Sequence, residues 1–128
     1  NGGFMLIGRK NETLESINNA IQHNVSQWGV SDKMNEQIMT NVVGLQIKKI
    51  RLIKHKTQTR VANKLSVSFQ QQQKYEKGTN ECRFVNLKRL SEYFNVDMDY
   101  FTRPLDDANC KFLTKREVNG YADSYRAR

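Results

Sequence analysis

Apolar residues recur at helical spacing along most of this chain, and that periodicity restricts its fold more than any other feature. Near the start, five of them follow one another at steps of three or four: Leu14, Ile17, Ile21, Val25 and Trp28. This spacing places all five on one face of an α-helix, whereas a strand would alternate apolar and polar residues. Only one proline and seven glycines interrupt the 128 residues. We therefore expect one small all-α protein.

A longer helix is expected to follow, from about residue 31 to about residue 56. Ser31 or Asp32 can cap its start. Its apolar residues keep the helical period as far as Ile50. We expect Lys48 and Arg51 to point outwards from this helix.

Two short helices should come next, each with its own cap. Thr57 is a capping residue type directly before the helical pattern 58–65. Ser68 can cap a second short helix, 69–77, and Gly78 suits its C-terminal end. The sequence thus predicts two short helices joined by a tight turn.

The rest of the chain reads as one further helix, a short closing turn and a tail. The next helix carries Phe84, Leu87, Leu90 and Phe94 at steps of three or four residues. The closing turn offers core candidates at Val96, Met98 and Phe101. The tail beyond Pro104 has weak periodicity, and a dimerisation arm, a packed helix and disorder are open alternatives for it.

The positive charge is concentrated in the middle of the chain. The net charge is +8, but residues 44–89 alone hold twelve Lys and Arg against two acids, a local +10, and the remainder holds nine against eleven. A concentrated excess of this kind points to a polyanionic partner, whereas a diffuse excess mainly affects solubility.

Nothing in the sequence indicates an enzyme or a metal site. There is no P-loop, no nucleophile elbow and no pair of carboxylates in an apolar setting. Cys82 and Cys110 lack metal-ligand spacing and should be free thiols, and His23 and His55 should be solvated. We expect no cofactor and no small-molecule ligand. No apolar run could span a bilayer, so a cytoplasmic protein without a membrane partner is expected.

The segment from "GLQIKKIR" at residue 44 through "SVSFQQQQKYEKGTN" to "NVDMDYF" resembles the lambda-repressor/Cro-like (XRE-type) helix-turn-helix family. Its form is similar to that of alphaproteobacterial regulators of this family. About 60 residues follow the family pattern, with these positions in register: Gly44, Ile47, Arg51, Thr57, Gln58, Val61, Ala62, Val67, Ser68, Glu76, Gly78, Leu87, Leu90 and Val96. The resemblance implies a domain of about five helices and sequence-specific binding of double-stranded DNA as a transcriptional regulator.

The resemblance also implies which residues of the second short helix read bases. These would be Phe69, Gln70, Gln73 and Lys74. Glutamine can bond adenine in a bidentate fashion, lysine reaches guanine acceptors, and phenylalanine can contact a thymine methyl. Gln72 departs from the pattern, because the family usually has Val or Ile there, packed on Ala62; it is either half-buried with a locally bonded amide or a sign that the helix is shifted. Ser66 replaces a frequent turn glycine.

A second set of residues would contact phosphates and so position the protein without specifying sequence. These are Thr57, Gln58, Arg60, Lys64, Gln71, Lys77, Thr79 and Asn80.

The chain would act as a homodimer on a palindromic operator, because two recognition helices one DNA turn apart read a two-fold site. The stripe Leu14, Ile17, Ile21, Val25 and Trp28 lies outside the helix-turn-helix segment and is a candidate dimerisation surface; core packing is the alternative. We expect an N-terminal helical extension (1–41), the DNA-binding domain (42–103) and a C-terminal tail (104–128). An antitoxin-like or scaffold module and a non-specific architectural DNA-binding protein are alternative functions.

Overall fold

The computed structural model describes residues 13–106, and within this range every regular element is helical, as expected. The elements are α2 (Leu14–Ser26), α3 (Asp32–Ile53), α4 (Gln58–Leu65), α5 (Phe69–Lys77), α6 (Phe84–Phe94), the 3-10 helix η1 (Met98–Phe101) and α7 (Arg103–Asp106). The expectations for Cys110 and for the tail beyond residue 106 lie outside the described residues.

Side-chain caps begin four of the helices. The Thr13 hydroxyl accepts a hydrogen bond from the Ser16 amide at the start of α2. The hydroxyls of Ser31, Thr57 and Ser68 accept from the backbone amide three residues further on, at the starts of α3, α4 and α5. Each cap pairs an amide that the first helical turn leaves without a partner, which is why the polar residue before each apolar pattern predicts the start.

Three of the helices end at residues in the left-handed region. Gly78, with φ of 77°, terminates α5 as predicted, while Ser66 and Asn95 adopt φ of 59° and 58° after α4 and α6. Glycine and asparagine tolerate this conformation, whereas serine adopts it with strain. The turn between the two short helices therefore has the geometry expected for glycine, with a serine in place.

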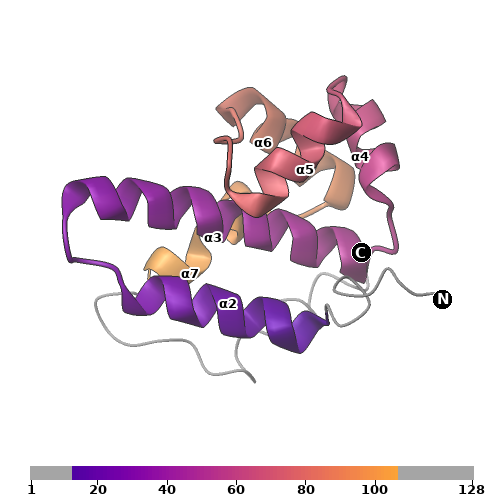
Figure 1. Cartoon of the computed structure of the whole chain (residues 1–128). Helices are drawn as coiled ribbons and strands as arrows, with labels where there is room; N and C mark the ends of the chain where they lie inside the picture. The colour runs from indigo at the N-terminus through magenta and orange to yellow at the C-terminus, as the bar shows by residue number, and fades with distance from the viewer. Residues whose placement is uncertain (1–12, 107–128) are drawn as a thin grey trace, which may run out of the picture.

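The helices form two groups on opposite sides of α3 (Figure 1). α2 runs antiparallel to α3 on one side, and α4, α5 and α6 pack on the other side, towards the C-terminal half of α3. α7 contacts both α2 and α3. The expected domain boundary between residues 41 and 42 falls inside α3, which continues across it as a single helix.

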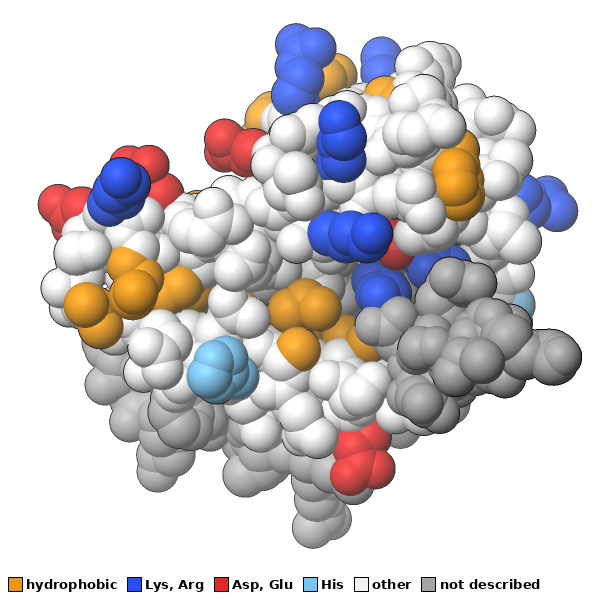
Figure 2. Space-filling model, viewed as in Figure 1, with side chains coloured by type: hydrophobic (Ala, Val, Ile, Leu, Met, Phe, Trp, Pro, Cys, Tyr) orange, Lys and Arg blue, Asp and Glu red, His pale blue; other side chains and the backbone are white. Residues whose placement is uncertain are grey.

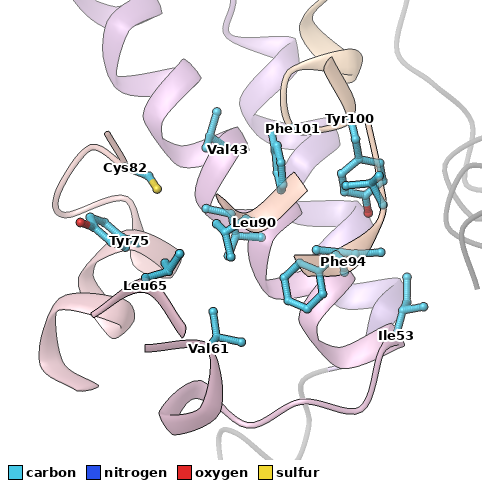
Figure 3. Packing of buried hydrophobic residues seen from close by; sticks show 13 residues of the cluster. Val43, Ile53, Val61, Leu65, Tyr75, Cys82, Leu90, Phe94, Tyr100 and Phe101 are labelled. Carbon is cyan, nitrogen blue, oxygen red and sulfur yellow. The ribbon is translucent and has the colours of Figure 1, made fainter. Parts of the chain in front are cut away.

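The larger core lies between the C-terminal half of α3 and the helices α4 to η1 (Figure 3). It consists of buried apolar side chains and includes Ile47, Ile50, Val61, Leu65, Tyr75, Leu90, Phe94, Val96, Tyr100 and Phe101. Val96 and Phe101 are core residues as predicted, and Met98 is only half-buried. This core holds the inner face of α5 and so fixes which of its residues point to solvent.

A smaller core joins α2 to α3. Ile17, Ile21 and Val25 are buried against Ile38, Val42 and Leu105, with Trp28 partly buried beside them, and Leu14 packs partly buried against the larger core. The apolar stripe of α2 is therefore covered by its own chain, and core packing describes these residues in the structure.

A chain of amide hydrogen bonds links α2 to the end of α5. Asn41 on α3 donates to Asn24 Oδ1 on α2 at 2.9 Å. Gln37 donates to Asn41 Oδ1 at 2.8 Å and to the Gly78 carbonyl oxygen at 3.0 Å. The N-terminal helices thereby contact the segment that terminates α5. None of the helices formed by residues 13–106 is long and apolar enough to cross a membrane.

Candidate nucleic-acid interface

Helix α5 has an exposed face and a buried face. Phe69, Gln70 and Lys74 are exposed, with 41% of the Phe69 surface accessible, and Gln73 is half-buried on the same side. On the opposite face Gln72, Tyr75 and Glu76 are buried. The four residues predicted to read bases thus share one accessible face of a short, capped helix.

The buried face of α5 carries a charged network that the sequence interpretation missed. Arg51 on α3 donates to Glu76 through Nε at 2.7 Å and through Nη2 at 3.0 Å. Only 9% of the Arg51 side chain and 1% of the Glu76 side chain are exposed. The expectation that Arg51 points outwards is wrong, because a partner 25 positions away holds it inside.

Gln72 belongs to the same network. It is fully buried rather than half-buried, and its Nε2 donates to Glu76 Oε2 at 2.9 Å. Of the two alternatives that the sequence offered for Gln72, the amide bonded to a neighbouring residue is the one observed. Its carbonyl oxygen has no hydrogen-bond partner among the described residues. An unpaired buried acceptor of this kind costs about 1–3 kcal/mol.

Hydrogen bonds orient three of the residues predicted to contact phosphates. Gln58, the first residue of α4, donates from Nε2 to Glu76 Oε1 at 3.0 Å. Asn80 donates from Nδ2 to the carbonyl oxygen of the Gln71 side chain at 3.2 Å. Because its carbonyl accepts from Asn80, the amide nitrogen of Gln71 is available to donate, which is the role that a phosphate requires.

The remaining predicted phosphate contacts lie on α4 or directly before it, and at the end of α5 or just after it. Arg60, Lys77 and Thr79 are exposed. The Thr57 hydroxyl caps α4 by accepting from the Arg60 amide. The Lys64 ammonium lies 5.5 Å from the centre of the Tyr93 ring on α6, a cation–π distance.

Several Lys and Arg side chains lie on the surface formed by α4, α5 and α6. Figure 2 shows them spread over this part of the molecule, whereas acidic side chains gather near the start of α3. The local charge excess of the sequence is therefore also an excess on one region of the surface. Such a region attracts the phosphate backbone of nucleic acids.

Two large apolar side chains are exposed just after α5. Phe84 and Val85 at the start of α6 are 74% and 41% exposed. The helical period predicts Phe84 as an inward residue, and the structure places it outwards because α6 turns Leu90 and Phe94 to the core instead.

In the described part of the chain, the other titratable side chains singled out in the sequence are one buried thiol and two exposed imidazoles. Cys82 is a free thiol, and burial, with a smaller effect of the Glu81 charge, raises its pKa to about 12. It therefore stays protonated near neutral pH and is a poor nucleophile. His23 and His55 are exposed, as expected. Residues 13–106 contain no group of three His, Cys, Asp or Glu side chains that could hold a metal ion.

Comparisons with known proteins agree with the geometry of α4 and α5. A family model described as helix-turn-helix matches residues 47–101, from the C-terminal half of α3 to the end of η1. No solved structure gives a significant match.

Curated relatives are also similar to this segment. The chain is 33% identical over 73 residues to uncharacterized HTH-type transcriptional regulators of Rickettsia conorii and Rickettsia prowazekii. These matches cover 57% of this chain and 58% and 56% of the two relatives. A third such regulator, from Sinorhizobium medicae, is 37% identical over 59 residues, covering 46% of this chain and 42% of its own.

The chain thus spans less than six-tenths of the length of these relatives. The segment matched by the family model contains α5 and its neighbours α4 and α6. The predicted resemblance of this segment to the lambda-repressor/Cro-like (XRE-type) helix-turn-helix family is thus confirmed for residues 47–101.

Proposed function

We propose that this protein is a bacterial, sequence-specific DNA-binding transcriptional regulator that inserts α5 into the major groove. The observation that carries the proposal is the two-sided character of α5. Its accessible face presents Phe69, Gln70, Gln73 and Lys74, which can contact base edges. Its other face is held by the core and by the hydrogen bonds from Arg51 and Gln58 to Glu76. A recognition helix requires both a readable face and a fixed orientation.

Phosphate contacts would supply most of the affinity and set the register on DNA. The start of α4, with Gln58 and Arg60, and the end of α5, with Lys77 and Thr79, flank the reading face in sequence. Both segments carry exposed side chains that can donate hydrogen bonds. The Gln71 amide, oriented by Asn80, would add a contact between them.

A homodimer on a palindromic operator is part of the proposal. A single recognition helix rarely gives sufficient affinity and specificity, whereas two helices one DNA turn apart read a two-fold site. Ile17, Ile21 and Val25 are core residues of one chain. We therefore propose that other surfaces form the dimer contact. A regulator of this kind would work in the cytoplasm, on the nucleoid.

The test is a selection of bound sequences from a random pool of DNA duplexes at near-physiological salt. We expect enrichment of a two-fold-symmetric site that binds about a thousandfold or more tightly than scrambled duplex. Binding without any enriched site would instead indicate a non-specific architectural protein. Absence of DNA binding would favour a protein-protein module with the same fold.

A further inference from the structure

The carboxylate of Glu76 has its full set of hydrogen bonds from three helices. Oε1 accepts from Arg51 Nη2 and from Gln58 Nε2, both at 3.0 Å. Oε2 accepts from Arg51 Nε at 2.7 Å and from Gln72 Nε2 at 2.9 Å. A carboxylate offers about four acceptor positions, so all of them are occupied. One buried group thereby connects α3, α4 and α5.

Gln72 has a weak rationale as a stabilising residue. Its side chain is fully buried, donates one hydrogen bond from Nε2 to Glu76 and leaves Oε1 without a partner among the described residues. An apolar side chain of similar size would remove that unpaired acceptor and is usually tolerated in such a site without loss of stability. The amide must therefore contribute something other than net stability, and its one bond leads to Glu76.

We propose that Gln72 is a positioning residue for base reading. Its bond to Glu76 lies within α5 and orients the carboxylate towards Arg51 on α3 and Gln58 on α4. The bonds from Arg51 and Gln58 then fix the rotation of α5 about its axis. Residues of a helix move together, so a rotation of α5 would displace Gln70, Gln73 and Lys74 relative to the phosphate contacts of α4. The network thus sets the angle between the reading face and the groups that hold the DNA backbone. This inference rests on the proposed function.

The experiment replaces each amide by an apolar side chain of similar length. Gln72→Met and Gln58→Met each remove one bond to Glu76, and Gln27→Met, at the exposed end of α2, is the matched control. For each variant the unfolding midpoint is measured, together with the affinity for the selected site and for scrambled duplex.

For Gln72→Met we expect an unchanged or higher unfolding midpoint. The ratio of specific to non-specific affinity should fall by about tenfold, the size of one lost hydrogen bond to a charged group. Gln58→Met should lower the same ratio, and the double variant should lose no more than the larger single loss, because both amides act through one carboxylate. Gln27→Met should leave the ratio unchanged.

The alternative outcomes are distinguishable. If the wild-type protein selects a site and both Gln72→Met and Gln58→Met keep its affinity ratio, the positioning role is wrong and the proposed function stands. Additive losses in the double variant would also overturn the shared network. If Gln72→Met fails to fold, the affinity ratio of Gln58→Met, a change at the half-buried start of α4, tests the network by itself: a lower ratio supports it and an unchanged ratio overturns it. If the wild-type protein enriches no DNA sequence, both the proposed function and this inference are wrong.

Discussion

Gly44 on α3 lies directly against the backbone of Tyr75 on α5. A methyl group at Gly44 would overlap the Tyr75 carbonyl oxygen and would lie 3.0 Å from the carbonyl oxygen of Glu76. The absence of a side chain at this position is therefore what allows α5 to approach α3. We predict that Gly44→Ala lowers the free energy of unfolding by about 1–3 kcal/mol, the range for an overpacked core.

Chemical denaturation of Gly44→Ala measures the change in the free energy of unfolding, and the sign of that change is sufficient for the test. In a helix interior without close contacts, Gly→Ala stabilises by about 1 kcal/mol. A stabilised variant would show that α5 does not pack closely at Gly44. Loss of site selectivity is expected to accompany the destabilisation, because α5 must move away from α3.

Ser66 holds the turn between α4 and α5 in the left-handed region, with φ of 59°. We predict that Ser66→Gly raises the free energy of unfolding by up to about 1 kcal/mol, because glycine adopts this conformation without steric strain. Thermal unfolding measures the effect. Asn95→Gly is the matched control at φ of 58°, and its gain should be smaller because asparagine tolerates this region well. A Ser66→Gly variant less stable than the wild type would contradict the turn geometry.

The apolar stripe of α2 is predicted to act as core. Ile21 is 1% exposed, so Ile21→Ala should lower the free energy of unfolding by about 2–5 kcal/mol. The molecular mass of the folded protein, measured by light scattering, should stay the same. Asn19→Ala, on the exposed side of α2, should change neither quantity. A lower mass with unchanged unfolding would instead identify the stripe as an interface between copies.

Lys64 and Lys77 are predicted to contact phosphates rather than bases. Lys77→Ala or Lys64→Ala should weaken binding to all DNA sequences by a similar factor. Each should reduce the slope of log affinity against log salt by about one, because one phosphate contact is lost. Titrations at several salt concentrations with the selected and the scrambled duplex measure this. An effect confined to the selected duplex would assign that lysine to base reading.

The elements of the fold that depend on neighbouring residues could be predicted from the sequence. The caps at Thr57 and Ser68 and the end of α5 at Gly78 involve groups within a few residues of one another, so the local pattern is sufficient. The exposed face of α5 also follows from its period together with the family resemblance.

What the sequence could not predict depends on contacts between distant residues. Arg51 looks like a solvated base within its helix, and only the approach of Glu76 from another helix reveals why it is buried. The sequence did contain a hint of this buried pair. Glu76 is one of only two acids in the basic segment, and it lies one helical turn after Gln72. Helical spacing on α2 likewise cannot indicate whether its stripe packs on the same chain or on another.

The most direct test of the account is a comparison of the sequences selected by the wild-type protein and by Gln70→Ala. Gln70 is exposed on the face of α5 that we propose reads bases, and it lies outside the Glu76 network. The account predicts that Gln70→Ala relaxes the preference at one position of each half-site, with a loss of about 1–3 kcal/mol for the preferred base, and keeps the rest of the site. Lys74→Ala should relax a different position. An unchanged selected sequence for both variants would contradict the claim that α5 reads DNA through this face.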